Sequence, residues 1–183
     1  MGYERDKFEV AGLTVRIIAD DDPPNPRTDY DHLATILYME GSRHYLGDKT
    51  ATREEIKAIT ERDDVIWLPV YAYIHSGVTI NTTGFSCPWD SGQCGIIYVE
   101  RETVRKEWGK KRISPKMYQK MIELLKSEVE EFDQFLTGDV WGYVVEDSDG
   151  EQLESCWGFY GAEYCIEEAK MVAEHASKEL ITA

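Results

Sequence analysis

The chain lacks several features that would place it or assign it a reaction at once. No apolar run reaches the roughly 18 residues of a membrane-spanning helix. The opening residues, MGYERDKFEV, lack the apolar core of a secretory signal. A glycine-rich phosphate loop is missing as well. We therefore expect a soluble, cytoplasmic protein with no membrane contact.

Cysteine is scarce, and its spacing does not favour a metal site. The four cysteines are Cys87, Cys94, Cys156 and Cys165. Their spacing does not match the C-x2-C pattern of structural zinc sites. Without a secretory signal, free thiols are the expected state, and a zinc site made of all four thiolates is the alternative.

Basic residues are also in short supply. The chain has 20 Lys and Arg against 35 Asp and Glu, a net charge of −15. Such a charge opposes direct binding to a phosphate backbone and favours basic partners. The imbalance is concentrated in residues 123–154, where eleven acids face one base. Residues 105–120 have the opposite character, with seven bases and one acid.

Hydrophobic patterning predicts an α+β fold in a single domain, residues 1–183. Strands are expected at 65–74, 78–82, 95–99, 140–146 and 152–159, with a strand or hairpin at 8–19 and a strand or buried helix at 33–39. Helices are expected from a capping box at Thr52 to near Arg62, and at 100–108, 114–136 and 162–181. The 114–136 and 162–181 helices should pack on one face of a mostly antiparallel sheet of five to seven strands. Trp141 and Trp157 should form a cross-strand pair on a hairpin closed by Asp149-Gly150.

The segment between the strands at 65–74 and 95–99 is unusually rich in polar and aromatic residues. It supplies the candidate binding residues His75, Trp89, Asp90 and Gln93, with Trp89 as a contact residue. Cys87 with His75 as its base would be a nucleophilic pair, but protease-type signatures are absent. The loop is alternatively structural, with Asp90 and Gln93 bonded to backbone groups.

Two groups of carboxylates are further candidates. Asp20, Asp21 and Asp22, with His44, could hold a hard divalent cation, or they form a solvated acidic turn. Glu128, Glu130, Glu131 and Asp133 lie late in the 114–136 helix, where negative charge opposes the helix dipole. Because these four acids oppose the helix dipole, we expect them to bind a partner.

Several strings carry a family resemblance: DDDPPNPR, LPVYAYIHSG, FSCPWDSGQCGIIYV, FDQFLTGDVWGYVVEDSDG and SCWGFYG. They resemble a group of small acidic proteins of bacteriophages, plasmids and Firmicutes. The resemblance supplies no catalytic residue. It implies an origin in a mobile element and a role of the anti-defence kind, such as anti-restriction or anti-CRISPR activity.

Three hypotheses follow. The first is a non-enzymatic acidic protein, without a cofactor, that inhibits a host defence complex by occupying its basic nucleic-acid-binding surface, for example on a CRISPR nuclease. The second is a small metal-dependent hydrolase or nucleotide-binding protein that uses Asp20–Asp22, His44, His75 and Asp90. The third is an accessory phage protein with no ligand.

Overall fold

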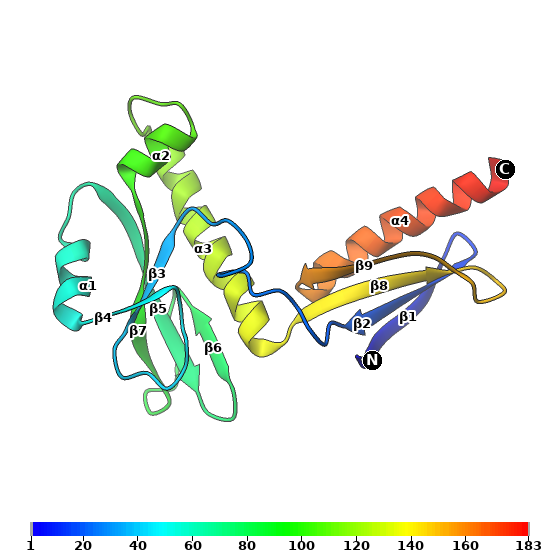
Figure 1. Cartoon of the computed structure of the whole chain (residues 1–183), viewed down its shortest axis with the longest axis horizontal. Coiled ribbons are helices and arrows are strands. Elements are labelled where there is room, and N and C mark those ends of the chain that lie inside the picture. The colour runs from blue at the N-terminus through cyan, green and yellow to red at the C-terminus, as the bar shows by residue number, and fades with distance from the viewer. Residues whose placement is uncertain (1, 183) are drawn as a thin grey trace. The chain divides into compact units, whose positions relative to one another are not determined.

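The computed structural model describes residues 2–182 and divides into two compact units, each with its own sheet (Figure 1). Unit 1 contains both ends of the chain, up to Pro24 and from Gln134 onward, and unit 2 is the continuous segment Asn25–Asp133. The α+β class is confirmed, with mostly antiparallel strands and four helices in the described residues. The prediction of one sheet is wrong. The strands near the two ends of the chain pair with one another, and the strands from the middle of the chain form a separate sheet.

The sheet of unit 1 is antiparallel, in the order β1-β2-β8-β9. β1 (Glu4–Val10) and β2 (Leu13–Ala19) form a hairpin whose turn, Ala11-Gly12, has φ values of 52° and 85°. Positive φ at both central residues is typical of the type I′ turn, which suits the twist of paired strands. β8 (Val140–Glu146) and β9 (Gln152–Tyr160) form the second hairpin, which confirms the prediction from Asp149-Gly150.

Helix α4 (Ala162–Thr182) covers one face of this sheet. The helix presents Cys165, Ala169 and Ala173, all fully buried and spaced four residues apart. Side chains this small let the helix approach the strands closely, where it packs against residues such as Val15 and Tyr143.

The two tryptophans of this sheet do not pair, so the predicted aromatic pair is wrong. Trp141 is buried with the residues under α4. The β8–β9 register shifts next to Gly142, and the Trp157 ring lies where a Cβ atom on Gly142 would be. Because neighbouring residues of a strand face opposite ways, the ring of Trp157 lies on the other side of the sheet.

Unit 2 is built on a five-stranded sheet in the order β4-β3-β7-β5-β6. Its strands are β3 (Thr35–Met39), β4 (Lys49–Ala51), β5 (Val65–Ile74), β6 (Val78–Asn81) and β7 (Ser91–Glu100). Only the β3–β4 pair is parallel among the described strands. β6 pairs only with Tyr71–Ile74, so β5 has the free side that Pro69 requires.

Three helices accompany this sheet. α1 (Arg53–Thr60) begins at the predicted capping box of Thr52 and Glu55 and packs Ile56 against a cluster that includes Leu37 and Ile96. α2 (Arg101–Glu107) follows β7 directly. α3 (Pro115–Thr137) has a buried stripe of Met121, Leu125, Val129 and Phe132.

The prediction that the helices at 114–136 and 162–181 share one sheet is wrong. α4 packs on the sheet of unit 1, whereas α3 belongs to unit 2 as far as Asp133. Among the described helices, none combines the length and the hydropathy that crossing a bilayer requires.

Candidate functional site

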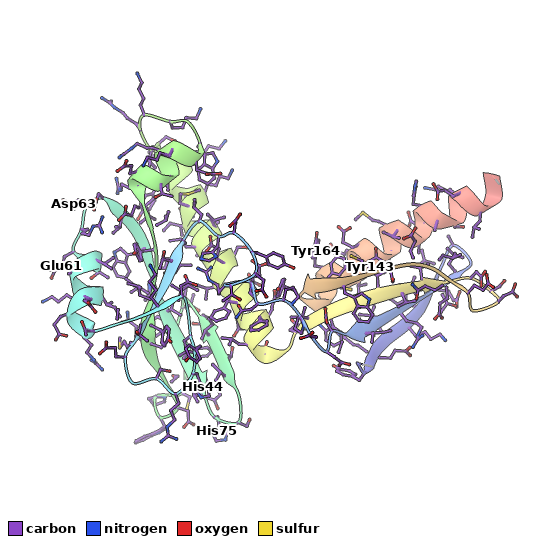
Figure 2. All side chains as sticks on the ribbon, in the orientation of Figure 1. His44, Glu61, Asp63, His75, Tyr143 and Tyr164 are labelled. Carbon is purple, nitrogen blue, oxygen red and sulfur yellow. The ribbon has the colours of Figure 1, made fainter. Side chains whose placement is uncertain are left out.

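The strand order of unit 2 gathers three loops at one edge of its sheet. β3 and β5 both run antiparallel to β7, so both end at the edge where β7 begins. The loops 40–48, 75–77 and 82–90 therefore lie toward that end of the sheet, and we call them the loop edge. Figure 2 shows His44 and His75 at this end of the sheet. The topology thus places His44 at the same end of the sheet as His75 and Asp90, which lie far from it in the sequence.

Trp89 is the outstanding residue of the loop edge, because 91% of its surface is exposed. Its loop is nevertheless well ordered by internal hydrogen bonds. The Asn81 side-chain oxygen accepts from the amides of Thr83 and Gly84, and the Ser91 hydroxyl donates to the Cys87 carbonyl. An exposed indole on an ordered loop can contact a partner at little entropic cost. Gln93, in contrast, donates to the Gly95 carbonyl and supports the strand.

His75, Asp90 and Cys87 form a small polar cluster at the same edge. Asp90 Oδ2 lies 3.6 Å from His75 Nδ1 and 3.8 Å from Cys87 Sγ. The carboxylate therefore contacts both side chains, whereas a nucleophilic pair requires the thiol to contact the imidazole directly. His75 also stacks on Tyr73, with ring centroids 6.4 Å apart. This arrangement orders the loop and favours a binding role over a nucleophilic one.

Cys94 and Cys165 are poor nucleophiles for a separate reason. Burial raises the pKa of Cys94 to about 11 and that of Cys165 to about 12, so both remain protonated at neutral pH. The cysteines described by the structure are all free, as expected.

Arg27 lies at the centre of a hydrogen-bond network, although the sequence analysis did not predict a role for it. Its guanidinium donates to both oxygens of Asp48, at 2.8 and 2.6 Å, to Glu128 Oε2 at 2.8 Å and to the Ala34 carbonyl at 2.8 Å. Only 4% of its side chain is exposed. Burial lowers the pKa of Arg27, but the bonds to Asp48 and Glu128 outweigh this and leave the pKa above its ordinary value.

The carboxylates of this network also bind the backbone. Glu128 Oε1 accepts from the amides of Leu33 and Ala34, and Asp48 Oδ2 accepts from the amide of Ile36. The network thereby ties the segment before β3 to α3. No short-range sequence pattern predicts this network, because Arg27 and Glu128 are 101 residues apart.

The four acids predicted on the long helix have different surroundings. Glu128 is bound within the network, and Asp133 accepts from the Thr79 hydroxyl and the Ile80 amide. Both therefore stabilise unit 2 directly. Glu130 is exposed, and Glu131 is half-buried. Of the four, Glu130 and Glu131 are the ones left to meet a partner.

One of the early aspartates, Asp20, also has a structural role. Asp20 accepts from the amides of Asp22 and Gly158, which holds the chain after β2 against the irregular part of β9. Asp20–Asp22 belong to unit 1, whereas His44, His75 and Asp90 belong to unit 2. Among the described residues, no group of three or more His, Cys, Asp or Glu side chains is arranged to hold a metal ion.

The negative charge is concentrated in unit 1. Unit 1 has 17 acidic and five basic residues, a net charge of −12, whereas unit 2 has 18 acidic and 15 basic residues, a net charge of −3. The acidic segment 123–154 is therefore divided, and its larger part belongs with the acids of α4. No protein-family model, curated protein or solved structure matches this chain.

Proposed function

We propose that the chain is a non-enzymatic binding protein that inhibits a nucleic-acid-handling defence complex by occupying a basic surface. The observation that carries the proposal is the net charge of −12 on unit 1. A basic channel built for a phosphate backbone attracts any surface of high negative charge density. The resemblance to acidic proteins of mobile elements agrees with such a role, and a CRISPR nuclease or a restriction enzyme is the proposed target.

Most acids of unit 1 lie at the surface of the protein. Eleven of the 17 are exposed: Glu4, Glu9, Asp21, Asp22, Asp149, Glu151, Glu154, Glu163, Glu167, Glu174 and Glu179. The few basic residues are partly neutralised, since Arg16 is bound to Glu4 and Glu146. The exposed acids extend over the β8–β9 turn and along α4, whose 21 residues span about 30 Å. A surface of this length can replace several phosphates.

The loop edge of unit 2 supplies the specific part of the proposed contact. Charge alone attracts many basic proteins, and selectivity requires shape and apolar contact as well. Trp89 offers a large apolar surface that the fold does not use. Truncation of an indole that becomes buried at an interface costs about 2 kcal/mol or more of binding free energy.

A competition assay tests the proposal. Binding of DNA by a Cas9-type nuclease and by restriction enzymes is measured with increasing amounts of the protein, at several salt concentrations. We expect inhibition that weakens steeply with salt, because it depends on attraction between exposed charges. Neutralising four exposed acids of unit 1 (Glu151→Gln, Glu154→Gln, Glu167→Gln, Glu174→Gln) should weaken inhibition about tenfold or more.

Four exposed acids of unit 2 provide a control with the same change in net charge: Glu40→Gln, Glu54→Gln, Glu61→Gln and Asp63→Asn. This variant should inhibit nearly as well as the natural protein. If both fourfold variants lose inhibition equally, net charge alone is responsible and the role of unit 1 is refuted. Inhibition that is insensitive to salt would refute the electrostatic basis itself.

A further inference from the structure

A cavity of about 700 Å³ lies in unit 2, beside the network of Arg27. One wall is the segment Pro26–Leu33 before β3, and another is the side of α3 that carries Leu124, Glu128 and Glu131. Trp108, at the end of α2, contributes an aromatic ring. The volume falls within the range of small-molecule sites.

The charges around this cavity are mostly negative. Its lining includes four acids (Asp31, Glu107, Glu128, Glu131), and Arg27 is the only Lys or Arg in that lining. Arg27 is fully engaged with Asp48 and Glu128, so its charge is already compensated. The lining of the cavity therefore carries a net negative charge, which favours cations over anions.

Two aromatic residues in the lining, Tyr30 and Trp108, add a second kind of cation recognition. The face of an aromatic ring attracts a cation within about 6 Å of its centroid. Lys120 Nζ lies 5.5 Å from the ring centroid of Trp108, so this ring already holds a cation of the protein and offers a ligand its remaining apolar surface. Tyr30 is 49% exposed and is therefore accessible to a ligand.

Glu131 is the third independent feature. It is half-buried, and in the described part of the chain it has neither a hydrogen bond nor a salt bridge. Burial, followed by the charge of Glu128, raises its pKa, although Arg27 acts in the opposite direction. A carboxylate in this position is costly unless a cation binds to it.

We infer that this cavity binds an organic cation that carries a guanidinium or alkylammonium group. The charged group binds at Glu131, and its methylene chain packs against Tyr30 and Trp108. Glu128 cannot take this role, because Arg27 and two backbone amides already occupy its oxygens. The inference goes beyond the proposed function, since it concerns unit 2 and a small ligand group, not the acidic surface of unit 1.

Titration of the full-length protein with defined cations tests the inference. Agmatine and spermidine represent free organic cations, and a capped Gly-Arg-Gly peptide represents an arginine side chain of a protein. The matched peptide with citrulline in place of arginine has the same shape without the charge. Binding is measured by calorimetry and by amide chemical shifts at about 150 mM salt, which screens non-specific attraction to the acidic surface.

Glu131→Gln and Glu130→Gln are a matched pair of variants, because both remove one charge from neighbouring positions on α3. Only Glu131 lines the cavity. We expect Glu131→Gln to weaken binding about tenfold and Glu130→Gln to change it less than about twofold. Tyr30→Ala should also weaken binding. Because the Tyr30 side chain is partly exposed, its truncation should leave the fold intact.

Each outcome of the titration decides something. Binding of agmatine or spermidine alone would support a free ligand, and binding of the arginine peptide but not the citrulline peptide would support a protein side chain. Absence of binding by all the cations up to about 10 mM would overturn the inference. Equal weakening by Glu131→Gln and Glu130→Gln would also overturn it, since the effect would then come from net charge.

Discussion

Replacement of Arg27 by Met should destabilise unit 2 by about 3–4 kcal/mol, because it leaves two largely buried carboxylates without a cation. Exposure is 12% for the side chain of Asp48 and 11% for that of Glu128. Removing one member of a buried ion pair typically costs about 3–5 kcal/mol. The lower part of that range applies here, since backbone amides continue to bind both carboxylates.

Urea denaturation measures the loss, and hydrogen exchange locates it. With a slope of about 1–2 kcal/mol per molar urea, the transition of unit 2 should move by about 2 M. Hydrogen exchange in β3 should accelerate most, because the network holds the segment that leads into this strand. If the two units unfold in separate urea transitions, only the transition of unit 2 should shift.

Arg62 provides the matched control for this experiment. It also binds two carboxylates, Asp64 and Glu100, but the whole group lies on the surface. The hydrogen bonds to Asp64 and Glu100 raise the pKa of Arg62, yet solvent screens such pairs strongly. Arg62→Met should therefore have far less effect than Arg27→Met. Equal effects would refute the argument from burial.

A second substitution separates the lost bonds from the stranded charges. Glu128→Gln in the Arg27→Met background removes one uncompensated charge while keeping an oxygen for the amides of Leu33 and Ala34. We expect it to recover about 1–2 kcal/mol. A further loss of stability in the double variant would show that unpaired charge is not the cause.

Three further predictions concern other parts of the fold. Gly95→Ala should lower the free energy of unfolding by about 3 kcal/mol or more, because its Cβ would lie 2.0 Å from the Leu37 carbonyl oxygen. The control is Gly92→Ala on the same strand, whose Cβ would meet no atom within 4 Å, so its effect in urea denaturation should be nearly neutral. Glu131→Gln should raise the free energy of unfolding at pH 7 by a few tenths of a kcal/mol, with Glu130→Gln as the unaffected control. The raised pKa of Glu131 means that the folded protein binds its proton more tightly than the unfolded chain, so its contribution to stability falls as pH rises through that pKa, and the Gln variant should lack this dependence. In a thiol-reactivity assay at about pH 8, the exposed Cys156 should react first, while Cys94 and Cys165 should stay protected until the protein unfolds.

Local structure was accessible from the sequence where chemistry at short range determines it. The alternating residues of 65–74 and 140–146 predicted two strands with the observed bounds. The Thr52–Glu55 capping box and the Asp149-Gly150 turn were also confirmed. In each case, the groups that decide the structure lie within a few residues of one another.

Pairings between distant residues were not accessible. Nothing in the pattern of residues 13–19 indicates that their partner is the strand at 140–146, whose paired residues are at least 122 positions away, as for Ala19 and Trp141. The string PNPRTDY reads as a loop, and its arginine becomes the centre of a network only after α3 is in place. The loop edge likewise depends on strand order, which local periodicity does not encode.

In the sequence, the segment of unit 2 lies between the two segments of unit 1, and this order has a consequence for synthesis. The segment Asn25–Asp133 is continuous, so unit 2 can fold while the rest of the chain is still on the ribosome. The first hairpin, Glu4–Ala19, must wait for residues 140–160 to emerge before its sheet can form. During that interval, the edge of β2 that later pairs with β8 is open to other chains, and the abundant acidic side chains around it oppose aggregation by mutual repulsion.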